Sequence, residues 1–264
     1  MNLVKPFVLV GLGTLSLIGC GGSGGPESTT PTESKAAPAE SKAAAPAATT
    51  GTAALGGKIS YEGPPPVMEK VKLNADPKCA ALHKDGLERW QIHVKDGGLA
   101  DVLVYVKSGL KGSYPPPTDP VLLDQQGCDY HPHMVVMRAG QPLKIRNSDD
   151  TLHNIHPRPK ANQEFNVGQS KQGMEFVREG DRGFNKPEVM IPVGCDVHPW
   201  MRAFISVFDH PFYTVSKDDG TFEIKGLPAG EYEIEATHGK LKSQAQKVTV
   251  KDGETAALNF TFKG

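Results

Sequence analysis

Short apolar runs alternate with turn residues from about residue 55 to the end of the chain. Within many runs an apolar position is followed by a polar one, and this period of two is typical of half-buried strands. A short helix is expected from Pro77 through Lys84, because Asp76 suits the N-cap and proline suits the first helical position. The pattern predicts an all-β protein with strands at residues 58–61, 91–95, 100–107, 121–123, 134–137, 142–146, 188–193 and 204–208, and more after residue 218.

The first residues read as a targeting segment. Lys5 gives a short positive start, and residues 7–18 are mostly apolar but too short to span a bilayer as a helix. The segment ends Leu17-Ile18-Gly19-Cys20, which resembles the bacterial lipobox. The resemblance implies a lipoprotein signal peptide at residues 1–19, lipidation of Cys20 and an extracytoplasmic protein anchored to a bacterial membrane, in the periplasm or at the cell surface. An ordinary secreted protein with a chance cysteine is the alternative.

Residues 20–54 are expected to be a disordered tether. Residues 21–54 consist of Gly, Ser, Thr, Pro, Ala, Glu and Lys, too little apolar surface to offset the entropy of ordering. The formal net charge of the chain is −1, and no basic block or basic stripe with interleaved aromatic residues occurs. Nucleic acid is therefore not expected as a partner.

The loop Cys195-Asp196-Val197-His198-Pro199-Trp200-Met201 carries the chemistry that stands out. It offers a thiol, an imidazole and a thioether within one tight turn, and such soft ligands select copper over magnesium or calcium. A trigonal copper site needs a second imidazole, and His153 in the stretch His153-Asn154 is the candidate. A Cys–His pair is also found as a nucleophile with its base, or as half of a zinc site, although zinc seldom takes Met.

The loop resembles a known family. Cys-x-x-His-Pro-aromatic-Met-Arg before a β-run, with His-Asn upstream, is similar to the amicyanin and plastocyanin pattern of the cupredoxins, over about residues 118–208. The resemblance implies a Greek-key sandwich with one type 1 copper, held by His153, Cys195, His198 and Met201. It also implies an electron carrier rather than an enzyme, with a redox protein as its transient partner.

Four further residues of this region have expected roles beside the ligands. Pro199 and Trp200 are expected to border an exposed edge of His198 where a partner docks, although Trp200 also suits a sandwich core. Amicyanin-type loops commonly have proline where this chain has Val197, so an extra N–H is expected near the Cys195 sulfur, beside that of Asn154. Hydrogen bonds to the thiolate favour Cu(I) and raise the reduction potential.

Two cysteines remain once Cys20 is assigned to lipid and Cys195 to copper. In an oxidising compartment, Cys79 and Cys128 are expected to form a disulfide. The alternative is that Cys128 joins His131 and His133 in a second metal site, although no fourth ligand is in view.

The end of the chain resembles a second family. Asp219-Gly220-Thr221-Phe222 followed by Leu227-Pro228-Ala229-Gly230-Glu231-Tyr232 is similar to the carboxypeptidase-regulatory-like, transthyretin-like β-sandwich. The first strands of that family are matched far upstream, at residues 57–59 and 100–104. The expected domains are thus a cupredoxin at 112–208, joined to or inserted in a second sandwich made of residues 55–111 and 209–264.

The leading function is membrane-anchored single-electron transfer through copper. One rival is a lipoprotein that sequesters or delivers copper, with His131, His133 and His156 as extra sites. Another is a surface adhesion or carbohydrate-associated module whose copper site is vestigial. No nucleophile elbow, paired-carboxylate signature or zincin motif points to a hydrolase.

Overall fold

The structure is a computed structural model that describes residues 50–64, 66–73 and 76–264. The expected signal peptide, Cys20 and most of the tether lie outside these residues. Strands dominate the described residues, which belong to one structural unit, so the predicted all-β class is confirmed. Among them, no helix has the length and apolar character that crossing a membrane requires.

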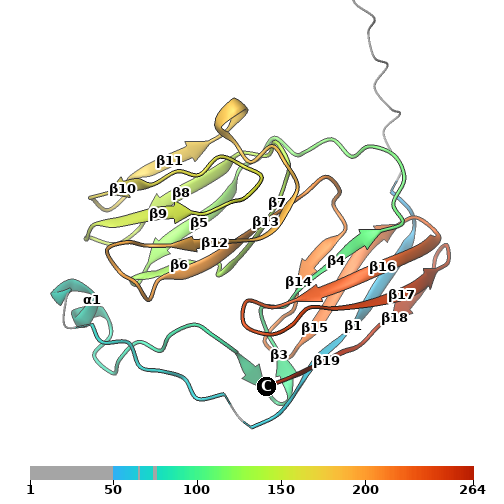
Figure 1. The fold of residues 1–264 in the computed structure, drawn as a ribbon, viewed down its shortest axis with the longest axis horizontal. Coiled ribbons are helices and arrows are strands. Elements are labelled where there is room, and N and C mark those ends of the chain that lie inside the picture. The colour runs from blue at the N-terminus through green and yellow to red at the C-terminus, as the bar shows by residue number, and fades with distance from the viewer. Residues whose placement is uncertain (1–49, 65, 74–75) are drawn as a thin grey trace, which may run out of the picture. The chain divides into compact units, whose positions relative to one another are not determined.

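Residues 121–208 form one β-sandwich, here called the inserted sandwich (Figure 1). One of its sheets contains β10 (Val167–Gln169), β9 (His153–Pro157), β12 (Glu188–Gly194), β13 (Arg202–Phe208) and β7 (Met134–Arg138), in that order. The other contains β11 (Glu175–Arg178), β8 (Leu143–Asn147), β5 (Val121–Gln126) and β6 (Asp129–His131). The pairs β13–β7 and β5–β8 are parallel, and the other pairs of this sandwich are antiparallel.

The strands follow the alternation that the sequence shows. In β8, Leu143 and Ile145 are fully buried, whereas Lys144 and Arg146 are only half-buried, so each face has its own polarity. The apolar faces of the two sheets enclose one core. Two details go beyond the predicted strands: β9 begins at His153 itself, and residues 157–186 hold β10, β11 and a 3₁₀ turn, η1 (Gly180–Arg182).

The second sandwich, here called the flanking sandwich, is built from strands on both sides of the inserted one in the chain. One sheet contains β15 (Thr221–Leu227), β1 (Ala53–Glu62), β3 (Gly98–Leu99) and β2 (Val94–Lys95), with β18 (Thr255–Ala257) and β19 (Phe260–Lys263) also paired to β1. The other contains β14 (Tyr213–Val215), β4 (Leu103–Ser108), β16 (Gly230–Thr237) and β17 (Gln244–Val250). Strand β1, which precedes the inserted sandwich in the chain, therefore pairs with β15, β18 and β19, which follow it.

The connection from β1 to β2 carries the expected helix, α1 (Pro77–Leu82). Asp76 caps it, because its Oδ1 accepts hydrogen bonds from the backbone N–H groups of Lys78 and Cys79 at 2.8 and 3.2 Å. Cys79 is buried and forms a disulfide with Cys128, in the turn between β5 and β6. The disulfide thus ties α1 to the inserted sandwich.

Candidate metal centre

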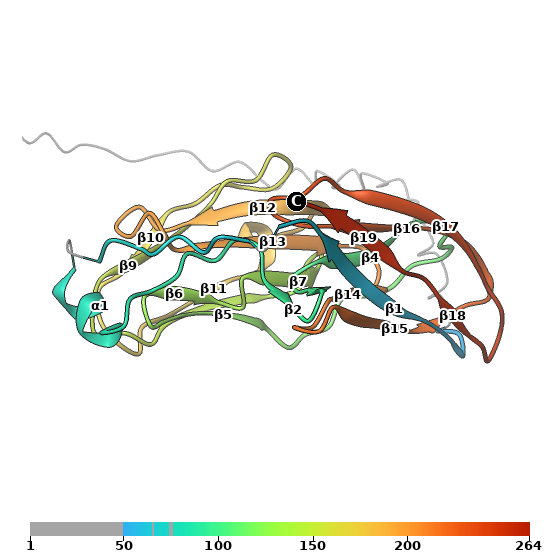
Figure 2. The ribbon, with the colours of Figure 1, turned by 90° about the horizontal axis from the view of Figure 1, so that it is seen from below.

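The four predicted ligands lie at one end of the inserted sandwich. His153 opens β9, and Cys195, His198 and Met201 lie on the loop between β12 and β13, two strands that run side by side in Figure 2. The loop closes on itself, because the Met201 N–H donates to the carbonyl oxygen of His198 at 2.9 Å. All four side chains are buried, with exposures between 0% and 4%.

Three of the four side chains converge. The Nδ1 atoms of His153 and His198 lie 2.9 Å apart, and the Cys195 sulfur lies 3.8 Å from Nδ1 of His198. Taken together, a ligand atom from each of the three residues lies within 4.8 Å of the other two. Met201 belongs to the same buried core as Cys195.

Each imidazole has a carboxylate behind it. Nε2 of His153 lies 2.9 Å from Oδ2 of Asp149, and Nε2 of His198 lies 2.9 Å from Oδ2 of Asp76. A carboxylate is an acceptor, so each Nε2 carries the proton and each Nδ1 of the neutral ring presents a lone pair. Two facing lone pairs 2.9 Å apart in a buried site repel, and either a metal ion or a proton shared between the two nitrogens relieves that repulsion. The donor set, a thiol and two imidazoles with a buried thioether on the same loop, therefore fits a metal ion.

Both carboxylates are held in the charged form. Burial raises the pKa of Asp76, but hydrogen bonds from His198, Thr151 and the backbone outweigh it and bring the pKa to about 2. Burial likewise raises the pKa of Asp149, and the hydrogen bond from His153, together with backbone N–H groups of the turn at Cys128, lowers it below its usual range. Sequence analysis identified Asp76 only as a helix cap and missed Asp149, whose spacing of four residues before His153 was the available signal.

Asn154 organises the backbone around Cys195. Its Oδ1 accepts from the N–H of Asp196 at 2.7 Å and from the N–H of Val197 at 3.4 Å, and it lies 3.2 Å from the Cys195 sulfur. The N–H of His198 points at that sulfur at 3.3 Å. The N–H that points at the Cys195 sulfur is thus that of His198. The N–H of Val197, the expected donor, points instead at Asn154 Oδ1.

The thiol is tuned by these contacts. Burial raises the pKa of Cys195, but the His198 side chain and the backbone N–H groups of Asn154, His198 and Val197 outweigh it, so the pKa lies below its ordinary value. The Val197 N–H therefore helps to lower the pKa of Cys195, although its hydrogen bond is to Asn154 Oδ1. A thiolate is the form that binds a metal.

The expected docking edge at Trp200 is wrong. Trp200 is only 8% exposed, its ring centroid lies 4.9 Å from that of His198, and its Nε1 donates to the carbonyl oxygen of Cys128 at 3.0 Å. Pro199 is exposed, but the neighbouring His198 is 2% exposed. The indole fills the core of the sandwich because its N–H finds a backbone acceptor there.

The residues of the alternative second site do not form a cluster of three ligands, although the ring centroids of His131 and His133 lie 5.6 Å apart. Cys128 is in the disulfide, His133 pairs with Asp129 at 2.9 Å, and His156 lies between Asp196 and Glu164 at 3.0 and 2.8 Å. Among the described residues, the clusters that could hold a metal all include His153 or His198. The second-site alternative therefore gains no support from the geometry.

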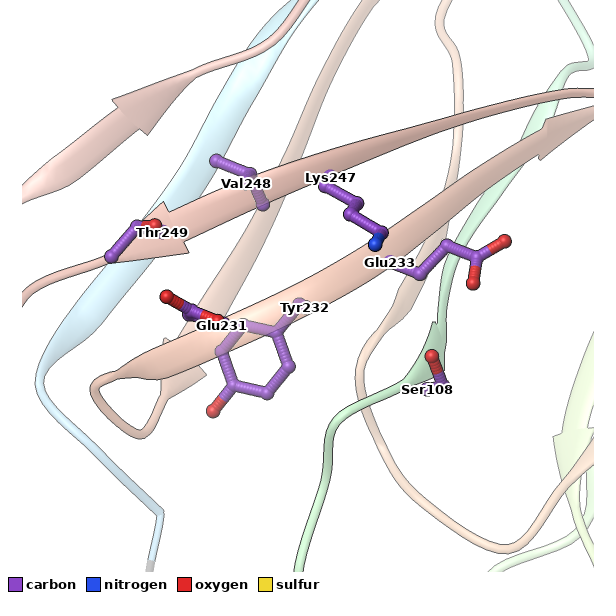
Figure 3. Close-up of a pocket in the computed structure, with 7 residues that line it drawn as sticks. All are labelled: Ser108, Glu231, Tyr232, Glu233, Lys247, Val248 and Thr249. Carbon is purple, nitrogen blue, oxygen red and sulfur yellow. The ribbon is translucent and has the colours of Figure 1, made fainter.

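A separate depression lies on the flanking sandwich, far from the ligands in sequence (Figure 3). Its volume is about 440 Å³, and its labelled side chains come from β16, β17 and the end of β4. In Figure 3 the side chains of Glu231 and Glu233 extend to different sides of the depression.

Comparison with known proteins finds one family model that is similar to part of the chain. A model of the carboxypeptidase regulatory-like domain matches residues 198–263, the stretch from the ligand loop to β19. No curated protein matches the chain.

Several solved structures resemble it. A Cu-containing nitrite reductase (NirK) from Thermus scotoductus SA-01 is 20% identical, with a TM-score of 0.31. The match covers 40% of this chain and 26% of the reductase chain, so this chain spans about a quarter of the reductase. A purple cupredoxin from Nitrosopumilus maritimus is 20% identical over 33% and 97%, with a TM-score of 0.27. A Cu(I) structure of an amicyanin mutant is 16% identical over 39% and 97%, with a TM-score of 0.29. At these TM-scores the metal assignment rests on the geometry above.

Proposed function

We propose that the chain is a copper protein that transfers single electrons. His153, Cys195 and His198 would hold one type 1 copper, and Met201 would tune it as a weak further ligand. The observation that carries the proposal is the pair of Nδ1 atoms 2.9 Å apart, each on an imidazole backed by a carboxylate. Copper is favoured over zinc because a buried thioether accompanies the thiolate and the imidazoles, and zinc sites are made of Cys, His and carboxylate ligands.

When bound, copper supplies a one-electron couple between Cu(I) and Cu(II). The residues of the chain hold the ligands at fixed positions, so little rearrangement accompanies the change of charge. Burial of all four side chains excludes water from the site. Asn154 and the closed loop fix Cys195, while Asp149 and Asp76 fix the two imidazole rings.

The visible spectrum tests the proposal. The purified protein should bind one equivalent of Cu(II) and turn intensely blue, from charge transfer between the Cys195 thiolate and Cu(II). Cys195→Ser should abolish the colour, and His131→Ala, an exposed residue outside the site, should keep it. A wild-type protein that binds Cu(II) but stays colourless would reject electron transfer and favour copper sequestration.

We further propose that lipid on Cys20 anchors the protein outside the cytoplasm, where it meets a redox protein transiently. The support is the lipobox-like Leu17-Ile18-Gly19-Cys20 and the composition of residues 20–54. In a bacterial host the wild type should partition into detergent, and Cys20→Ala should not. An unmodified Cys20 in the mature wild-type protein, measured by mass spectrometry, would reject the anchor. The domain limits given above stay predictions.

A further inference from the structure

The segment that supplies Asp76 comes from outside the inserted sandwich. It follows β1 of the flanking sandwich, forms α1 and returns to β2. Figure 2 shows α1 at the end of the inserted sandwich where β9 begins. A residue far upstream of the ligand loop thus reaches the imidazole of His198.

Several contacts hold this segment on the sandwich. Besides the Cys79–Cys128 disulfide, they are Asp76 Oδ2 with Thr151 Oγ1 at 3.0 Å, Lys78 with Asp150 at 2.9 Å, and His83 Nε2 with the carbonyl oxygen of Gly127 at 2.6 Å. The anchors lie on two different turns of the sandwich, 127–128 and 150–151. Residues 76–83 therefore form a fixed cover, here called the cap.

The cap closes the outer side of His198. Its Nε2 lies 2.9 Å from Asp76 Oδ2 and 3.7 Å from the Cys79 sulfur, and the side chain is only 3% exposed. The two oxygens of Asp76 have separate tasks, because Oδ1 caps α1 and Oδ2 accepts from His198 and Thr151. Capping of α1 uses only Oδ1 of Asp76, so it does not explain why Oδ2 points at the imidazole of His198.

We propose that Asp76 is a positioning residue for the copper ligand His198, and that the cap closes this edge of the site to a partner. Asp76 accepts the Nε2–H of His198, which fixes the ring and leaves Nδ1 directed toward the metal. Its negative charge also favours the more highly charged Cu(II) over Cu(I). The inference rests on the proposed copper function.

The test uses substitutions that separate capping from positioning. Asp76→Ser keeps a good N-cap but is too short to hold His198. Asp76→Asn removes the charge and keeps one oxygen, so it can cap α1 or accept from His198 but not both. Lys78→Ala is the matched control on the same helix, since it removes the surface ion pair with Asp150 and no contact to His198.

The first measurement needs no copper. Nitrogen-15 NMR of the metal-free protein at neutral pH should show His198 as the Nε2–H tautomer in the wild type and in Lys78→Ala, and as a mixture in Asp76→Ser. An unchanged tautomer in Asp76→Ser would overturn the proposal and leave Asp76 as a helix cap.

The second measurement is the reduction potential of the copper-loaded protein. Asp76→Asn should lower the preference for Cu(II) over Cu(I) roughly tenfold, if the loss falls on Cu(II) alone and equals the smallest loss of metal affinity typical for removal of a partner behind a ligand. That change equals a rise of about 59 mV for a one-electron couple. A potential that moves no more than in Lys78→Ala would overturn the proposal. A protein that never turns blue would instead reject the proposed function, while the NMR result still decides whether Asp76 holds His198.

Discussion

Asn154 offers the sharpest test of how the ligand loop is held. Its side chain is 6% exposed and joins β9 to the loop that carries Cys195. Replacement with alanine removes the acceptor for two loop N–H groups and the donor to Asn166. Alanine is smaller than asparagine, so it introduces no steric clash in β9.

The size of the effect follows from the geometry of the bonds. Two of them are short, from the Asp196 N–H at 2.7 Å and to Asn166 Oδ1 at 2.7 Å, whereas those with the Val197 N–H and the Asp196 carboxylate are 3.4 and 3.3 Å long. Each well-formed hydrogen bond contributes about 1 kcal/mol net, and the long ones contribute less. Asn154→Ala should therefore lower the free energy of unfolding by about 2 kcal/mol.

Urea unfolding of the metal-free protein measures this change. Asn166→Ala is the comparison variant. It removes the bond from Asn154 and a bond to the Asp196 carboxylate at 2.6 Å, but it leaves the acceptor for the loop N–H groups in place. Because Asn166 is exposed, water replaces its bonds, and Asn166→Ala should cost less than Asn154→Ala. Asn154→Asp keeps Oδ1 but brings a second carboxylate close to Asp196, and it should fall between the wild type and alanine. If Asn154→Ala costs no more than Asn166→Ala, the loop does not depend on Asn154 and the reasoning fails.

Three further predictions concern stability. Cys79→Ala with Cys128→Ala should lower the free energy of unfolding by roughly 4 kcal/mol in urea without reductant, because the disulfide closes a loop with a sequence separation of 49; a loss under about 1 kcal/mol would contradict this. Gly57→Ala should lower the free energy of unfolding by about 2 kcal/mol or more, measured by thermal unfolding, because its Cβ would collide with a backbone carbonyl oxygen between β18 and β19. Gly56→Ala should be nearly neutral, because the atom nearest to its Cβ would lie 3.6 Å away. Burial lowers the pKa of His238 from 6.5 to about 4. The contribution of this residue to stability is therefore complete above pH 6.5, and it falls between pH 6.5 and 4 because only the unfolded chain takes up a proton there. His238→Asn should lessen that fall by about 3 kcal/mol, and equal pH profiles would refute the buried neutral histidine.

Much of the local structure could be predicted from the sequence. The period of two in stretches such as 143–146 follows from the opposite orientation of successive side chains in a strand, so β8 could be placed without knowledge of its partners. The start of α1 could be placed for a similar reason, because Asp76 and Pro77 act on the neighbouring turn alone. The choice of His153, Cys195, His198 and Met201 came from residue chemistry and spacing, and their copper binding stays a prediction.

The tertiary structure decided what lies around those residues. A helix-cap motif specifies one oxygen of Asp76, and only the docking of the cap brings the other oxygen to His198. Trp200 was expected at an edge, yet its place in the core depends on an acceptor at Cys128, beside another sheet. Strand β1 pairs with β15, β18 and β19 in a register that no local pattern encodes, because an alternating strand presents the same faces to any partner. Contacts between distant segments depend on which surfaces pack together, and the chain determines that only as a whole.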